Sequence, residues 1–236
     1  MIVSLDVKYH SQYLFLPVRR GDHSLLGVEL IADFISDNAS VRIPPGLVLS
    51  RITAEQRLIL FYEAISLLEQ NREFFIQNQV LAWVSVDEII VSALLSGVAL
   101  QKRVSELPFL EFSLTEDYPG LNAGKAHPQL NALQALHPLL LANYGSGGAT
   151  SRAVYEGMYR RVKLDKQFIN RQLSPSTFEP FISAIIKQIS PCCDTLILPG
   201  IENEIARRHA IALGVGAVQG RLWPPVMAAS LASLIE

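Results

Sequence analysis

The chain has 236 residues, of which 50% are hydrophobic and 18% are charged, and its formal net charge is −2. This composition is typical of a globular protein with a large buried core, and it excludes an intrinsically disordered chain. Because the charge is close to neutral and no apolar stretch reaches the roughly 18 residues of a membrane span, binding to nucleic acid or to a membrane is not expected.

Eight short apolar runs have the length and composition of buried β-strands. In chain order they lie at residues 13–17, 26–31, 81–86, 109–115, 139–141, 161–165, 195–198 and 215–219. Such continuous apolar runs, rather than alternating ones, indicate strands that are covered on both faces, as in a parallel sheet.

Helical patterns separate most of these runs. In chain order, helices are expected at residues 53–68, 87–98, 130–136, 151–159, 178–189, 202–213 and 225–235. Thr53 and Gln56 have the spacing of a capping box, and Asp87 is a good N-cap for the helix whose apolar face ends at Val98. Pro180 is compatible with its helix only if it lies in the first turn.

This alternation of strands and helices indicates βα units around a parallel sheet. It continues from end to end without a low-complexity linker, so residues 1–236 are expected to form a single domain. Eight strands favour a closed barrel of the TIM (β/α)8 type, although periodicity alone leaves an open sheet as the alternative. Residues 38–49, which include two prolines, are expected to be a loop.

In a parallel barrel, functional side chains lie at the C-terminal ends of the strands. The polar residues expected at these ends are Glu29, Ser85, Glu116, Asn143, Lys163, Asp165, Glu202 and Gln219. Each of them, taken alone, is also compatible with an ordinary polar rim. The strand at residues 139–141 ends in Ala142 and Asn143, where a catalyst would usually have carboxylates.

Other motifs give little support to a specific chemistry. The glycine-rich residues 145–148 lack the spacing and the lysine of a P-loop, the five histidines show no zinc-binding spacing, and no nucleophile elbow occurs. The apolar residues 222–227 are equally compatible with a strand-to-helix corner and with an exposed anchor for a partner.

The two cysteines and the N-terminus indicate a cellular compartment. Cys192 and Cys193 are adjacent and have no other cysteine as a partner, so a structural disulfide is not expected. The first residues lack the basic and apolar regions of a signal peptide. A cytoplasmic protein is therefore expected, with the two cysteines in an inert packing role.

Eight collinear motifs resemble those of the EAL-domain family of cyclic-di-GMP phosphodiesterases. They are residues 27–31 (GVELI), 42–45 (RIPP), 83–86 (WVSV), 113–116 (SLTE), 141–147 (LANYGSG), 162–165 (VKLD), 198–202 (LPGIE) and 219–220 (QG). The resemblance covers almost the whole chain. It implies a modified TIM barrel of the EAL-domain type, in which the first strand is antiparallel to the others.

The resemblance also implies a site for two divalent cations, which activate water against a phosphodiester. Such cations need several oxygen ligands, mostly carboxylates. Of the family's metal ligands Glu29 is retained, whereas Ser85, Ser113, Ala142, Asn143 and Pro199 replace the others. Lys163, Glu202 and Gln219 also persist, as does Glu116, which supports a loop in the family. With one metal carboxylate left, we expect no metal, no cofactor and no catalysis.

Binding of cyclic-di-GMP is also expected to be lost. By resemblance, Asp33 stands where the family has an arginine that faces a phosphate of the dinucleotide. An anion at this position repels the phosphate and removes a charge-assisted hydrogen bond. The retained Lys163 and Glu202 are then interpreted as a structural ion pair across the barrel mouth, with Glu29 beside them.

Within the family, the chain resembles a group of degenerate, stand-alone EAL proteins. The shared stretches are residues 9–11 (YHS), 74–77 (FFIQ), 164–169 (LDKQFI), 178–181 (FEPF) and 188–193 (QISPCC). This resemblance implies a non-enzymatic anti-activator that binds the flagellar master regulator FlhDC through its FlhD subunit and represses flagellar genes. The alternatives are a cyclic-di-GMP receptor without catalysis and a residual phosphodiesterase.

Overall fold

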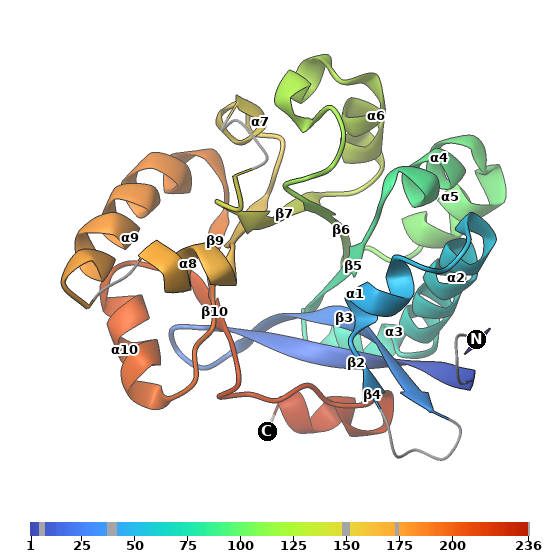
Figure 1. The fold of residues 1–236 in the computed structure, drawn as a ribbon, viewed down its shortest axis with the longest axis horizontal. Coiled ribbons are helices and arrows are strands. Elements are labelled where there is room, and N and C mark those ends of the chain that lie inside the picture. Colours follow the sequence, from blue (N-terminus) through green and yellow to red (C-terminus); the bar gives the residue numbers. More distant parts are fainter. Residues whose placement is uncertain (5–7, 37–41, 148–151, 173–174, 236) are drawn as a thin grey trace.

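The structure is a computed structural model that describes residues 1–4, 8–36, 42–147, 152–172 and 175–235. Within these residues, eight strands close into a barrel (Figure 1). The barrel strands are β2 (Lys8–Arg20), β3 (Leu25–Ser36), β5 (Leu81–Ser85), β6 (Leu110–Thr115), β7 (Leu139–Tyr144), β8 (Arg161–Leu164), β9 (Thr195–Pro199) and β10 (Ala217–Gln219). All eight strands expected from the apolar runs are present.

The direction of the strands confirms the modified TIM barrel. Strand β2 is antiparallel to both of its neighbours, β3 and β10. The other neighbouring pairs around the barrel, from β3 through β5 to β10, are parallel. The pairing of β2 with β3 closes the ring, so the open-sheet alternative is wrong.

Helices and short 3-10 segments surround the barrel (Figure 1). They are α1 (Pro45–Leu49), α2 (Ala54–Gln70), α3 (Arg72–Gln77), α4 (Glu88–Ser96), α5 (Val98–Ser105), η1 (Leu121–Ala126), α6 (Pro128–Leu136), α7 (Arg152–Tyr155), α8 (Lys166–Gln172), α9 (Pro175–Ile189), η2 (Ser190–Cys192), α10 (Glu204–Ala212) and η3 (Ala228–Leu234). In the described part of the chain, no helix has the length and apolarity to span a membrane.

The local helix signals are borne out at two starts. The Thr53 hydroxyl accepts a hydrogen bond from the Gln56 amide at 3.2 Å, and the Gln56 side chain accepts one from the Thr53 amide at 3.0 Å. The Asp87 carboxylate accepts from the Ile90 amide at 3.0 Å and caps α4. Each cap satisfies backbone N–H groups that the first turn leaves unpaired.

Several expected boundaries are wrong. The helix expected to extend to Val98 breaks at Gly97, and Val98 is 80% exposed. Helix α9 begins at Pro175, so Pro180 lies inside the helix rather than in its first turn. Of the helix expected at residues 151–159, only Arg152–Tyr155 is helical, and residue 151 lies outside the described residues. The last segment is the 3-10 helix η3.

Strands β2 and β3 are longer than expected and continue beyond the barrel as an antiparallel hairpin. Strands β1 (Ile2–Ser4) and β4 (Arg42–Ile43) pair with this extension. Residues 38–49 were expected to be a loop, but the described part of this segment contains β4 and α1. Val48 of α1 is fully buried in a small core with Phe34 and Leu60, so tertiary packing holds this short helix.

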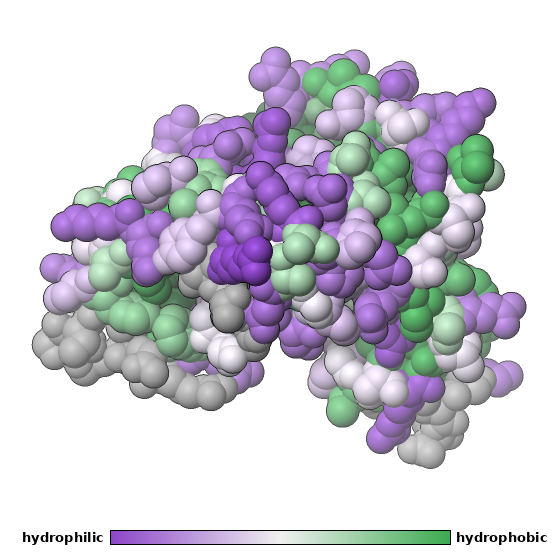
Figure 2. Space-filling model, turned by 90° about the horizontal axis from the view of Figure 1, so that it is seen from above, coloured by the Kyte–Doolittle hydropathy of each residue, from purple (hydrophilic) through white to green (hydrophobic). Residues whose placement is uncertain are grey.

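The barrel has separate inner and outer cores. The inner core includes Val18, Trp83, Leu140 and Ile197, and the larger outer core lies between the strands and the helices. Figure 2 shows a mostly polar surface from above, with larger apolar areas on the side where Figure 1 places α2, α4 and α5. The inner core places side chains at the barrel mouth, because alternate strand residues point inward.

Two tyrosines differ in whether their hydroxyl groups have a partner. The Tyr13 hydroxyl donates a hydrogen bond to the Leu60 carbonyl at 2.8 Å. The buried Tyr159 hydroxyl has no partner among the described residues. We expect Tyr13→Phe to lower the free energy of unfolding by about 1 kcal/mol and Tyr159→Phe to leave it unchanged or higher. Urea denaturation measures both, and a larger loss for Tyr159→Phe would contradict this assignment.

Candidate functional site

Three polar side chains meet inside the C-terminal half of the barrel. The Lys163 ammonium lies 2.8 Å and 2.7 Å from the two carboxylate oxygens of Glu29. The Gln219 side chain donates a third hydrogen bond to Glu29 at 3.0 Å. These three residues come from β8, β3 and β10, so closure of the barrel brings together positions far apart in the sequence. We call this group the Glu29 cluster.

Electrostatics keeps Glu29 charged. Burial raises the pKa of this carboxyl group. The nearby Lys163 ammonium and the hydrogen bonds from Lys163 and Gln219 lower it by a larger amount, so the pKa of Glu29 lies below its ordinary value. The side chains of Lys163 and Glu29 are only 10% and 18% exposed. The cluster is therefore a buried, compensated ion pair.

The space beside the Glu29 cluster is very small. Val18, Trp83, Leu140 and Ile197 enclose it together with the cluster, and it has no room for a water molecule. A second buried ion pair, between Arg161 and Glu111, lies in the same barrel interior, where the Trp83 indole donates to Glu111 at 2.7 Å. Side chains thus fill the barrel interior, as in other TIM-type barrels.

The prediction that Lys163 forms an ion pair with Glu202 is wrong. Glu202 does not reach Lys163, and its side chain is 53% exposed, 4.0 Å from the Lys166 ammonium and 3.8 Å from the Arg221 guanidinium. Glu202 follows the end of β9 by three residues, so it lies outside the ring of inward-facing strand positions. Glu29 lies within that ring and takes the ion pair instead.

The substituted positions are spread over the mouth. Ser85 and Asn143 are exposed, and Pro199 is half-buried at the end of β9. Ser113 and Ala142 are buried, and the Ser113 hydroxyl has no hydrogen-bond partner among the described residues.

Asn143 also marks an irregularity in β7. Its φ of 58° lies in the left-handed region that asparagine tolerates better than most residues. The pairing of β7 with β8 shifts register between Leu141 and Tyr144, on either side of this residue. The strand end is therefore bulged at Asn143, one of the two positions at which the resemblance to EAL domains implies an acidic pair.

Asp33 lies apart from the Glu29 cluster. It pairs with Gln12 in the hairpin of β2 and β3, and the Gln12 amide donates to its carboxylate at 2.8 Å. The Arg42 guanidinium lies 3.8 Å away. These contacts hold Asp33, which is 9% exposed, within the hairpin sheet.

Glu116 holds the glycine-rich loop that follows β7. Its carboxylate accepts hydrogen bonds from the Gly145 amide at 3.2 Å, the Ser146 hydroxyl at 2.7 Å and the Gly147 amide at 3.0 Å. Gly148, the last glycine of this run, lies outside the described residues. The carboxylate thus satisfies donors of a loop that has little secondary structure of its own.

Comparisons with known proteins identify the family. No protein-family model matches the chain. The anti-FlhC(2)FlhD(4) factor YdiV of Salmonella arizonae is 42% identical to it over 236 residues, which is 100% of both chains. This chain belongs to the YdiV family.

Solved structures agree with this assignment. The crystal structure of the EAL-like domain protein YdiV has a TM-score of 0.87 and 39% identity, and the match covers 97% of both chains. The EAL domain of Mycobacterium smegmatis DcpA has a TM-score of 0.74 at 14% identity, over 96% of this chain and 97% of that one, which shows the fold alone. The expected resemblance to a degenerate stand-alone EAL protein is confirmed at the level of family and fold.

The Glu29 cluster of this YdiV-family chain does not fit a divalent cation. Both oxygens of the one central carboxylate are bound by the Lys163 ammonium, which a cation would have to displace. No three His, Cys, Asp or Glu side chains in the described ranges are placed to hold a metal ion. Divalent cations such as Mg²⁺ and Ca²⁺ require several oxygen ligands at one point.

A larger cavity of about 500 Å³ opens between the strand ends of β3, β5 and β6 and helices α1, α2 and α4. We call it the mouth cavity. Glu29, Ser85 and Ser113 line it, but most of its lining is apolar. The sequence did not indicate Arg57 as part of this cavity, because no local pattern shows that it reaches Asp87.

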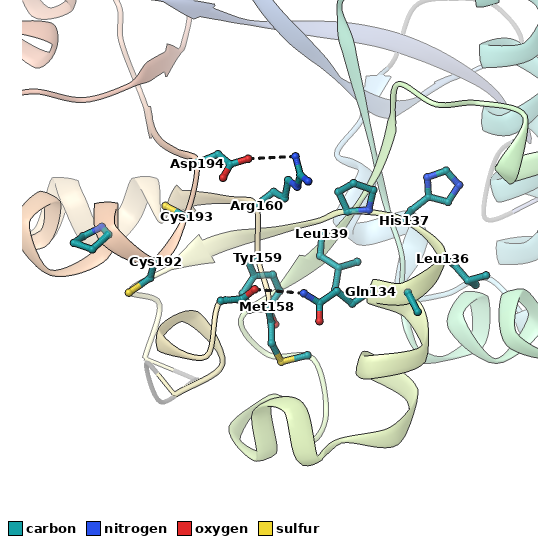
Figure 3. Close-up of a pocket in the computed structure, with 14 residues that line it drawn as sticks. Gln134, Leu136, His137, Leu139, Met158, Tyr159, Arg160, Cys192, Cys193 and Asp194 are labelled. Atoms are coloured by element: carbon teal, nitrogen blue, oxygen red, sulfur yellow. Dashed lines mark hydrogen bonds and ion pairs between the residues drawn. The ribbon is translucent and has the colours of Figure 1, made fainter.

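Another hollow of about 600 Å³ lies at the opposite end of the barrel, near the N-terminal ends of β7, β8 and β9 (Figure 3). Cys192 and Cys193 line it, with Arg160 and Asp194 beside them. Burial, first of all, raises the pKa of the Cys193 thiol to about 11, so this thiol stays protonated and unreactive at neutral pH. This supports a packing role, in keeping with the stabilising function of that barrel end.

Proposed function

We propose that this chain is a non-enzymatic anti-activator that binds the flagellar master regulator FlhDC through its FlhD subunit and represses flagellar genes in the cytoplasm. The observation that carries this proposal is the 42% identity over the full length to anti-FlhC(2)FlhD(4) factors. This identity extends over the full length of both chains, which supports a shared function of the whole fold.

The Glu29 cluster supports the loss of phosphodiesterase activity. Metal-assisted hydrolysis needs a cation that lowers the pKa of a bound water and neutralises the phosphate. Here the Lys163 ammonium occupies both oxygens of Glu29. By the resemblance, serine, alanine, asparagine and proline occupy the other positions at which EAL phosphodiesterases have metal ligands. We infer that the chain neither binds these cations nor hydrolyses cyclic-di-GMP.

Charge supports weak or absent binding of cyclic-di-GMP. The dinucleotide is an anion, whereas Asp117 is exposed at the mouth and Asp33 stands at the phosphate-binding position of the family. Two cations near the mouth cavity already form ion pairs: Lys163 pairs with Glu29, and Arg57 pairs with Asp87. Because these two cations are paired, neither is available to offset the repulsion that a phosphate would meet from the two aspartates.

A titration of the purified protein tests this function. We expect a saturable heat signal with purified FlhD and none with cyclic-di-GMP, with an active EAL domain as the positive control for the dinucleotide. Absence of an FlhD complex, with both proteins shown to be folded, would refute the anti-activator role. Micromolar binding of cyclic-di-GMP would support a receptor instead, and linear product formed with magnesium or manganese would establish a phosphodiesterase.

A further inference from the structure

The mouth cavity combines an apolar interior with an open edge. Tyr13, Ile31, Leu60 and Phe61 contribute to its wall. Its volume of about 500 Å³ falls in the range of pockets that bind large side chains or small molecules. The space directly beside the Glu29 cluster is closed, and a second hollow of about 510 Å³ at this end of the barrel, beyond β6, β7 and β8, is lined mainly by polar residues. The mouth cavity is therefore the more apolar of the two openings for a binding partner.

One arginine holds the edge of the cavity in place. Arg57 of α2 donates to the Leu49 carbonyl at the end of α1 and to the Asp87 carboxylate at the start of α4, both at 2.7 Å. These contacts join three elements around the opening. The cavity is therefore formed before any partner binds, which lowers the entropy cost of association.

Two leucines extend the apolar surface out of the cavity. Leu47 and Leu49 of α1 are 51% and 36% exposed, and Leu49 also lines the cavity. A contiguous exposed apolar surface beside a cavity marks an interaction site, and a cavity of this kind is where an anchor side chain of another protein is buried.

The charges at the edge indicate the kind of anchor. Asp117 lines the opening and is exposed, and Glu88, the exposed first residue of α4, directly follows the lining residue Asp87; neither makes an ion pair with a described residue. Arg57 is neutralised by Asp87. The edge is therefore net acidic around an apolar interior, and it complements an apolar side chain flanked by lysine or arginine. The same charges disfavour an anionic small ligand.

We propose that the mouth cavity is the docking site for the protein partner, which inserts an apolar side chain there and places basic residues against Glu88 and Asp117. This inference rests on the proposed function, since it takes FlhD as the partner. In this complex the mouth cavity is a protein-binding surface, with Leu49 as a central contact and Asp117 as a charged contact at its edge.

Two variants and one control test the site by calorimetry with purified FlhD. Leu49→Asp introduces a charge against the anchor and is expected to weaken binding by about tenfold or more. Asp117→Lys is expected to weaken binding and to reduce its dependence on salt, because an attractive pair becomes repulsive. The control is Ile205→Asp, since Ile205 is 75% exposed on α10 and lies outside the mouth cavity. It is expected to bind like the wild type.

The outcomes separate the two proposals. If the wild type does not bind FlhD, the proposed function fails. If the wild type binds, and Leu49→Asp and Asp117→Lys bind equally well while their circular dichroism and melting match the wild type, the docking site is wrong. Should Leu49→Asp fail to fold, Asp117→Lys decides alone, because its side chain is exposed. Loss of binding in Ile205→Asp would place the partner on α10 instead.

Discussion

Replacement of Lys163 by alanine is expected to lower the free energy of unfolding by about 3–5 kcal/mol at neutral pH. The substitution leaves the Glu29 carboxylate buried with only the hydrogen bond from Gln219. A charge removed from water without a counter-charge is strongly destabilising, even where the intact pair contributes little. Chemical denaturation followed by circular dichroism measures the loss, and FlhD binding by the folded variant is expected to be unchanged.

The pH dependence identifies Glu29 as the source of the loss. In the wild type the pKa of Glu29 is lowered, so its charge stabilises the fold above the ordinary pKa, and this contribution is lost as the pH falls through the lowered value. In Lys163→Ala, burial without the ammonium raises that pKa above its ordinary value. The variant therefore loses stability as the pH rises, and it is expected to be more stable at about pH 5 than at about pH 7.5.

Two control variants sharpen this test. Lys166→Ala removes a lysine that is 48% exposed and 4.0 Å from Glu202, and it is expected to change stability by less than about 1 kcal/mol. The double variant Glu29→Leu with Lys163→Met replaces the pair by apolar side chains and is expected to recover most of the loss. Melting of Lys163→Ala at the wild-type temperature would show that the Glu29 cluster does not stabilise the fold.

The barrel was predictable because its strands are covered on both faces. Residues such as Leu139 to Leu141, and Leu196 to Leu198, form apolar runs that do not depend on details of packing. The helix starts at Thr53 and Asp87 were predictable because a cap is a local interaction within one turn. The antiparallel direction of β2 came from the resemblance to EAL domains, since no pattern in β2 itself indicates it.

The short elements were not predictable. Helix α1 is a single turn without periodicity, and β4 has two residues, so both depend on tertiary contacts such as the burial of Val48. Helix α8 was missed for a similar reason. Its first turn is capped by Asp165, whose carboxylate accepts from the Phe168 amide at 2.6 Å, but Asp165 had been interpreted only as a polar residue at a strand end.

The candidate site was predictable in its members but not in its pairing. Glu29, Lys163 and Gln219 were identified from motifs, yet Lys163 was paired with Glu202. Which carboxylate a lysine meets inside a barrel depends on the stagger between strands, and a sequence does not contain that register. The same limit applies to Arg57 and Asp87, which meet across the mouth cavity although 30 residues separate them.

Gly220, next to Gln219, is expected to tolerate no side chain. A methyl group there would lie only 2.6 Å from the Ile201 carbonyl carbon and closer still to other backbone atoms of that residue. The Ile201 backbone cannot retreat easily, because its amide donates to the Gln219 carbonyl and its carbonyl accepts from the Leu222 amide, both at 3.1 Å. Gly220→Ala must therefore displace the end of β10, and Gln219 with it.

We expect Gly220→Ala to lower the free energy of unfolding by about 3 kcal/mol, at the upper end of typical overpacking losses, because backbone rather than a flexible side chain blocks the new methyl group. The matched control is Gly46→Ala in α1, where a methyl group would meet no atom within 4 Å. Alanine there is expected to be neutral or stabilising by up to about 1 kcal/mol. Thermal and urea denaturation of both variants measure the difference in stability, and equal stability of the two would contradict the close approach of β10 to Ile201.

Because Gln219 donates to Glu29, the displacement of β10 also loosens the Glu29 cluster. The losses of stability from Gly220→Ala and Lys163→Ala are therefore expected to be less than additive in the double variant.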